Sequence, residues 1–236
     1  MLDVSPKESA TNFIFANNMA QSKLFNLFNL YSVAIVGLLF SVIEFLVGYG
    51  DKDFTIEVIA FMQAFSGLCG LFFAIWASQT PKERQVQNTF LYISGMLFEV
   101  AIFVTSLVNF SSFLYQSDIP GLYFLIPILS FVITFFLLYI FSMHKSQNFT
   151  STHARTASFG GFIVIFIVGM FIAEMINTSS ADFVHSLTDY AQGMLMIGAG
   201  SVANLILGLL TGFNFAKNLL VKRYDIDISR LYGSND

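Results

Sequence analysis

The sequence predicts an all-α integral membrane protein: a bundle of six transmembrane helices with both termini in the cytoplasm and a last helix that is long or broken. Three observations predict this fold. Hydrophobic residues make up 56% of the 236 residues and charged residues only 11%, whereas a soluble domain carries about a quarter charged residues. Six segments are long and apolar enough to cross a bilayer. Ten of the 11 Lys and Arg residues fall on one side of the resulting layout.

Each predicted span has roughly the 20 apolar residues that cross a hydrocarbon core about 30 Å thick. The spans are residues 27–48, 55–77, 89–112, 120–142, 158–178 and 187–221. The last is too long for one perpendicular helix, so we expect either a tilted helix that projects into the cytoplasm or two helices broken near Gly198 and Gly200. Pro127 inside the fourth span predicts a kinked helix with a packing role.

The basic residues predict the orientation, because Lys and Arg are retained in cytoplasmic loops. Only Lys52 falls on the outer side; the inner side holds Lys7, Lys23, Lys82, Arg84, Lys145, Arg155, Lys217, Lys222, Arg223 and Arg230. The chain therefore divides into a cytoplasmic arm (1–26), a transmembrane domain (27–221) and a cytoplasmic tail (222–236), and the plasma membrane is the expected location. Within the arm, Phe13, Ile14 and Phe15 are candidates for contact with the membrane surface.

Glu99 is the leading candidate for a functional residue. It falls near the middle of the third span. No other predicted span has a Lys or Arg at the same depth in the membrane. A buried carboxylate has to be neutralised by a proton, bind a cation or accept hydrogen bonds. Glu99 is therefore expected either to carry a proton- or ion-linked role or to donate a hydrogen bond between helices as a protonated acid. Its candidate polar neighbours are Gln63, Gln192 and Asn204.

Further carboxylates lie at the outer ends of the predicted spans. Because Lys52 alone opposes them, the following are candidates for a role in ion-linked transport together with Asn204: Glu44, Glu57, Glu174 and Asp189.

A weak metal-binding pattern begins the sixth span. Asp182, His185, Asp189 and Gln192 are spaced by three, four and three residues, which would place them on one face of a helix. Carboxylates with imidazole suit a divalent metal or a proton relay. A catalytic zinc site uses three protein ligands with histidine prominent, so one histidine argues against a metal-dependent enzyme. The alternative is that Asp182 caps the helix and His185 faces headgroups and water.

Residues 47–51 (VGYGD) resemble the selectivity filter of potassium channels, in which backbone carbonyls line the pore. That family places an outer helix and a pore helix before the filter, whereas only the first span precedes this string. Leu46 also stands where the family has a threonine. The alternative is that Gly48 and Gly50 end a helix and form a tight turn.

Small residues recur every four positions in the last span. Gly200, Asn204, Gly208 and Gly212 follow this spacing, and Gly208 and Gly212 match the GxxxG pattern of closely packed membrane helices. The seam predicts packing within the bundle, with self-association or a membrane-protein partner as the alternative. Asn204 would need a hydrogen-bond partner in such a seam.

Two functions are the main candidates, and a metal-dependent membrane enzyme is the third. The first is a small transporter or channel-like protein for a cation or small solute, linked to protons or cations through intramembrane carboxylates. The second is a non-catalytic membrane subunit or scaffold. Because no catalytic or nucleotide-binding motif is present, we expect no enzymatic activity, no cofactor and no nucleic-acid partner.

Overall fold

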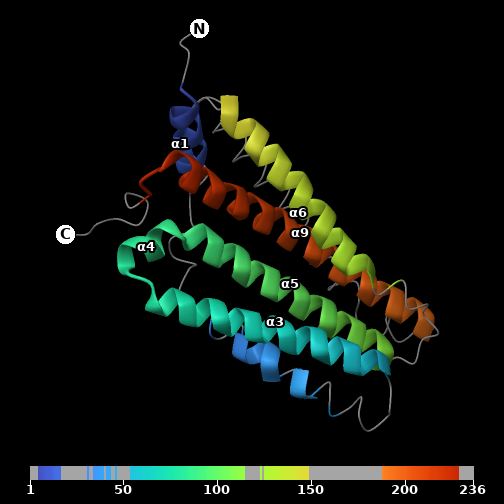
Figure 1. Cartoon of the computed structure of the whole chain (residues 1–236). Coiled ribbons are helices and arrows are strands. Elements are labelled where there is room, and N and C mark those ends of the chain that lie inside the picture. The colour runs from blue at the N-terminus through green and yellow to red at the C-terminus, as the bar shows by residue number, and fades with distance from the viewer. Residues whose placement is uncertain are drawn as a thin grey trace.

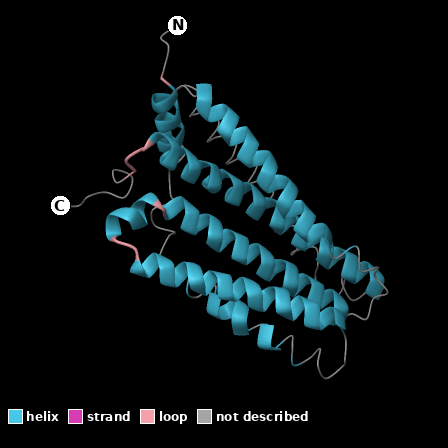
Figure 2. Cartoon of the chain, viewed as in Figure 1, coloured by secondary structure: helices cyan, strands magenta, loops and turns pink. Residues whose placement is uncertain are grey.

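The structure is a computed structural model that describes residues 5–16, 31, 34–39, 41–43, 46, 54–114, 123, 125–148 and 188–228. All regular elements within these ranges are helices (Figure 2). Apolar segments of this length favour helices because a helix satisfies its backbone N–H and C=O groups internally, without water. The predicted all-helical fold is confirmed for the described residues.

Four helices in the described part of the chain are long and apolar enough to cross a membrane. They are α3 (Phe54–Gln79), α5 (Thr89–Leu114), α6 (Ile126–Lys145) and α9 (Asp189–Tyr224). Each overlaps one of the predicted spans. The first predicted span is represented by helical residues within 34–43, and the fifth lies outside the described residues.

The four long helices form a row in the order α6, α9, α5, α3 (Figure 1). Three short elements of the described chain lie at one end of the bundle, where the long helices start or stop. They are α1 (Pro6–Ala16), α4 (Lys82–Gln87) and η3 (Ser146–Asn148). The helical residues 34–43 lie beside α3, where a Cβ added at Gly67 would touch Leu38. The central helices α9 and α5 are therefore covered on two sides by other helices, and α3 is covered by α5 and by residues 34–43.

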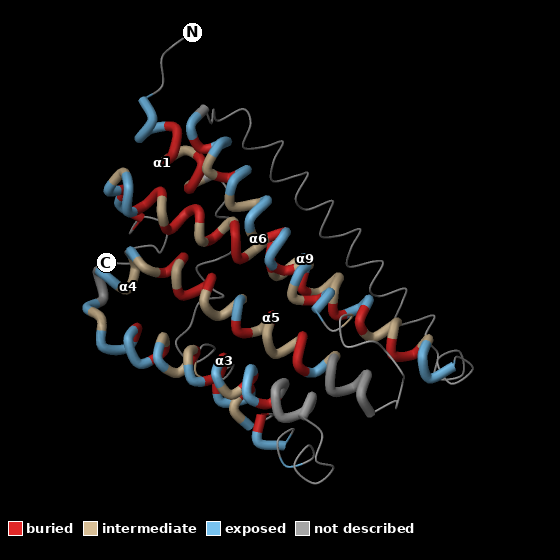
Figure 3. Tube along the Cα trace, turned by 45° about the vertical axis from the view of Figure 1, so that its right-hand side comes forward, coloured by how far each residue is buried: buried red, intermediate tan, exposed pale blue. Residues whose placement is uncertain are grey.

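Exposed residues occur along α3 and α6, the outer helices of the row (Figure 3), and many of them are large and hydrophobic. On α3 they include Phe61, Phe65 and Phe72, and on α6 Leu137 and Ile140. A water-soluble protein rarely exposes contiguous apolar patches of this extent. The exposed faces fit contact with lipid, and the polar residues of the bundle are directed inward.

Helix α9 is a single unbroken helix of 36 residues, so the alternative of a break near Gly198 and Gly200 is wrong. At 1.5 Å per residue it is about 54 Å long, well beyond the roughly 30 Å of a hydrocarbon core. The Thr188 side chain caps its start by accepting a hydrogen bond from the Ala191 N–H at 3.3 Å. Asp225, in the left-handed region with φ 48°, ends it.

Helix α6 also differs from the prediction. It begins at Ile126, so Pro127 lies in its first turn and not inside a kinked span. A proline is accommodated in the first turn because its missing N–H would have no partner within the helix.

The N-terminal helix α1 packs on the end of α9. Phe13 and Ile14 are buried in a cluster that includes Leu220 and Val221, and the Phe13 and Phe213 rings meet edge to face at 5.6 Å. The Ser9 hydroxyl donates to the Ser146 carbonyl at 2.8 Å. For Phe13 and Ile14, contact with the membrane surface is therefore wrong, because both side chains are directed toward α9 and not toward lipid.

Most basic residues of the described helices gather at one end of the bundle. They come from α1, α4 and the last turns of α6 and α9: Lys7, Lys82, Arg84, Lys145, Lys222 and Arg223. The start of α9 and the end of α6 lie at opposite ends (Figure 1). The basic residues that the sequence predicts on one side of the membrane are thus found together at one end of the structure.

Candidate functional site

Glu99 lies in the middle of α5 and is buried, with 3% of its surface exposed. It is the eleventh of the 20 residues of the apolar window Thr89–Val108. Neither carboxyl oxygen has a hydrogen-bond partner within the part of the chain that the structure describes. A polar group buried without a partner is costly, and a charged one far more so.

Two glycines from neighbouring segments lie against this carboxyl group, and we call Gly37 and Gly70 the glycine cradle. A Cβ added at Gly70 would collide with the Glu99 carboxyl group, and one at Gly37 would lie 3.9 Å from Oε1. The same added atom at Gly37 would lie 3.8 Å from the Cα of Gly67. Residues 34–43, α3 and α5 therefore meet at Glu99, and the absence of side chains on the cradle leaves room for the carboxyl group.

The contact of Gly70 with Glu99 fixes the register of the antiparallel helices α3 and α5. Six residues nearer the end of α3 that joins α4, Trp76 meets Tyr92 of α5, with ring centroids 5.6 Å apart. In the other direction, the same register brings Gln63 to the level of Ser106. Tyr92, Glu99 and Ser106 are spaced by seven residues and are all buried, so they lie on one face of α5.

Asn204 connects three helices at a separate position. It is fully buried in α9, and its Nδ2 donates to the Thr105 hydroxyl of α5 at 2.6 Å and to the Pro127 carbonyl of α6 at 3.1 Å. The Thr105 hydroxyl donates in turn to the Ala101 carbonyl at 2.8 Å. Asn204 has the partner that the glycine seam required, but it lies on the α9 side of α5, away from the face of Glu99.

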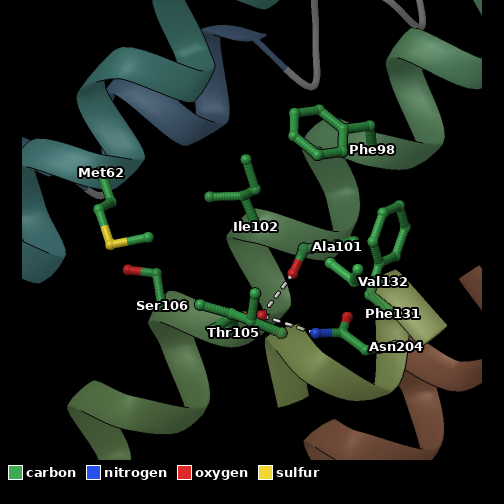
Figure 4. Close-up of a pocket in the computed structure, with 10 residues that line it drawn as sticks. Met62, Phe98, Ala101, Ile102, Thr105, Ser106, Phe131, Val132 and Asn204 are labelled. Atoms are coloured by element: carbon green, nitrogen blue, oxygen red, sulfur yellow. Dashed lines mark hydrogen bonds between the residues drawn. The ribbon is translucent and has the colours of Figure 1, made fainter. Parts of the chain in front are cut away.

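A cavity of about 310 Å³ lies next to Asn204 (Figure 4). It is lined by Met62, Phe98, Ala101, Ile102, Thr105, Ser106, Ile128, Phe131, Val132 and Asn204. Nearly all of this lining is apolar, and the Nδ2 of Asn204 donates to the Thr105 hydroxyl (Figure 4). Glu99 does not line the cavity.

The glycine seam of α9 contacts both neighbouring helices. A Cβ added at Gly208 would collide with the Phe131 carbonyl and the Thr134 hydroxyl of α6, and one at Gly212 with the Phe135 carbonyl. At Gly200 the added atom would meet Val108 of α5 at 2.7 Å. These three glycines are therefore occupied by helices of the same chain.

Lys217 was not singled out as a site residue by the sequence, where it counted only as one cytoplasmic charge. Its side chain is fully buried in α9, with Nζ 4.3 Å from the Phe213 ring centroid and 5.1 Å from that of Phe90. Aromatic faces attract a cation in this geometry. Asn214, about one turn earlier in the helix, and Asn218, the next residue, are buried too, and these polar residues among apolar ones were the available signal.

Most of the remaining candidates fall outside the residues that the structure describes. Glu44, Glu174, Asp182 and His185 lie outside the described residues, as does the side chain of Glu57, which belongs to the first turn of α3. Asp189 is exposed in the first turn of α9. The proposed metal ligands Asp182 and His185 precede the start of α9 at Asp189 and lie outside the described residues, so the metal site stays a prediction.

No protein-family model, curated protein sequence or solved structure matches this chain, so its function is argued from the geometry alone.

Proposed function

We propose that this protein is a small membrane transporter that moves a cation or small solute and is coupled to a proton or cation through Glu99. One observation carries the proposal: the Glu99 carboxyl group is buried at mid-helix without a hydrogen-bond partner among the described residues. A carboxyl group used only to hold helices together would be expected to form a hydrogen bond between them, as Asn204 does. Unsatisfied ionisable groups in spans usually belong to ion or proton pathways.

The glycine cradle supports the same proposal. The carboxyl group lies where three segments approach closely, so a change in its protonation or ion binding would alter the cost of burying it between them. A transporter needs this link between a bound ion and the relative position of helices.

The topology that we propose has six spans with both termini in the cytoplasm. The end of α6 and the start of α9 lie at opposite ends of the bundle, so the chain between them has to cross from one end to the other, which the predicted fifth span would do. The basic residues at the end formed by α1, α4 and the last turn of α9 favour that end as cytoplasmic.

The alternative function, a non-catalytic scaffold, is favoured in the sequence by the glycine seams and by the lack of a strong site motif. Since Gly200, Gly208 and Gly212 pack within the chain, they supply no surface for a partner. The scaffold becomes the preferred interpretation only if no transport is detected.

Reconstitution in proteoliposomes tests the proposal. A pH-sensitive dye inside the vesicles would report proton movement while Na⁺, K⁺, Mg²⁺ and a panel of small solutes are supplied outside. We expect a flux in the parent that Glu99→Gln abolishes, because glutamine keeps the size and hydrogen bonding but cannot ionise. Ser94→Ala, which removes a buried hydroxyl from the opposite, α9-facing side of α5, is the matched control and should retain the flux. Retention of the flux in Glu99→Gln would exclude the coupling role.

A further inference from the structure

The seam between α3 and α5 carries a row of buried polar groups beside Glu99. In α3, Gln63, Ser66 and Gly70 are spaced by three and four residues and therefore share one face, which the Gly70 contact directs toward α5. Gln63 is 1% exposed and Ser66 4%. Polar side chains in a lipid-embedded seam are costly, so a continuous row of them calls for an explanation.

Successive members of this row lie about one helical turn apart. With a rise of 1.5 Å per residue, Ser66 lies about 6 Å along α3 from the level of Glu99, and Gln63 about 4.5 Å farther. Steps of this length suit a hydroxyl and an amide bridged by single water molecules. The row leads from Glu99 toward the end of the bundle where α3 begins at Phe54.

Two members of the row have unused hydrogen-bonding atoms. Both amide atoms of Gln63 and both carboxyl oxygens of Glu99 have no partner among the described residues. Buried groups of this kind are commonly satisfied by ordered water. The two unsatisfied groups occur on facing helices about two turns apart along the axis, so a short water chain that passes Ser66 would satisfy both.

We propose that Ser66 and Gln63 form a proton pathway that connects Glu99 with the end of the bundle at the start of α3, and that the coupling ion is a proton. The inference rests on the proposed function. In the transfer step the Glu99 O–H bond breaks and its electron pair stays on the carboxylate. The proton binds the oxygen of Ser66 or of a bridging water, which passes its own proton outward. Gln63 orients the last water by donating from its amide nitrogen and accepting at its oxygen.

The charge around Glu99 favours a proton over a metal ion. The described faces that surround it carry Tyr92 as a titratable group on α5, Cys69 next to Gly70 on α3, and Ser41 in residues 34–43. A hard cation needs about six oxygen ligands, whereas a proton needs one acceptor. A single carboxyl group at the glycine cradle can accept a proton but supplies too few oxygen ligands for a hard cation.

Infrared spectroscopy of the purified full-length protein tests the pathway without a known solute. The carbonyl band of protonated Glu99 is the band that Glu99→Gln removes, and it shifts when deuterium replaces the carboxyl proton. After transfer into D₂O, we expect this shift to be slowed by about tenfold or more in Gln63→Leu and in Ser66→Ala, because each removes one hydrogen-bonding step. Ser94→Ala should exchange like the parent.

Exchange at the parent rate in both Gln63→Leu and Ser66→Ala would overturn the pathway. The Ser66→Ala change is small, so it provides the test if Gln63→Leu fails to fold. The outcome is separable from that of the proposed function. Loss of flux in Glu99→Gln together with unchanged exchange in the pathway variants would exclude only the pathway, whereas retained flux in Glu99→Gln would exclude the coupling role even if exchange is slowed.

Discussion

The carboxyl group of Glu99 in α5 occupies the space that a side chain at Gly70 in α3 would fill. The two residues lie in contact where α3 and α5 pack at the middle of the predicted membrane domain. Glycine at position 70 is required by this contact and not by backbone conformation, because α3 is regular there.

The effect of Gly70→Ala on the free energy of unfolding should depend on which residue stands at position 99. In the parent, the added methyl group displaces the Glu99 carboxyl, whereas in a Glu99→Ala background the space is open. We expect the double-mutant cycle to give a coupling of about 1–3 kcal/mol. Thermal unfolding in detergent measures it. The same effect of Gly70→Ala in both backgrounds would show that the two residues do not touch.

Gly208→Leu and Gly212→Leu should lower the melting temperature more than Gly70→Ala. At these positions the neighbouring atoms are backbone carbonyls of α6, which cannot rotate away as the end of a glutamate side chain can. Leu209→Ala, on a different face of α9, is the control and should be milder. If both glycine variants melt like the parent, α9 does not pack on α6 as described.

Gly198→Ala provides a second control for these substitutions. Nothing lies within 4 Å of a Cβ at that position, so the change should be neutral or slightly stabilising because alanine favours a helix by about 1 kcal/mol over glycine. A strong loss of stability would mean that an unseen surface contacts this face of α9, and the size of the complex in detergent would then be measured.

Thr105→Val should destabilise the bundle by about 1 kcal/mol, because it keeps the shape but removes the acceptor for Asn204 at 2.6 Å. Thr211→Val is the matched control: the Thr211 hydroxyl bonds only to the Leu207 carbonyl of its own helix in the described structure. Unfolding in detergent compares the two. Equal melting temperatures would contradict the interhelical role of Asn204.

Phe13→Ala should lower the melting temperature more than Phe61→Ala does. Phe13 is 4% exposed against α9, and removal of a buried phenylalanine costs about 3–5 kcal/mol. Phe61 is 71% exposed on α3, where its contact is with lipid or detergent. The variants are compared by melting temperature and by protease cleavage within α1. A harmless Phe13→Ala would place α1 away from α9.

Much of the helical framework could be predicted from the sequence because long apolar segments have few alternatives in a membrane. The extents of α3, α5 and α9 follow the hydropathy closely, and Glu99 is identified by its depth alone. Hydropathy does not show which helices touch. It therefore missed the cradle of Gly37 and Gly70 at Glu99, and it assigned Asn204 no specific partner.

The ends of the bundle were predicted less well. Hydropathy treats a short polar arm as solvent-exposed, so the packing of Phe13 on α9 was missed. It likewise treats a lysine near a helix end as exposed, whereas Lys217 lies over Phe213 and Phe90. Aromatic side chains can surround a lysine only when distant segments meet, and this information is not local in the sequence.

The response of transport to an imposed pH gradient tests the central claim most directly. Proteoliposomes that contain the parent or Glu99→Gln are compared with and without a gradient, in the presence of whichever cation or solute supports flux. The account predicts that the gradient accelerates flux in the parent and has no effect on Glu99→Gln, while the melting temperatures of the two proteins stay close. The same acceleration by the gradient in both proteins would contradict the assignment of Glu99 as the coupling residue.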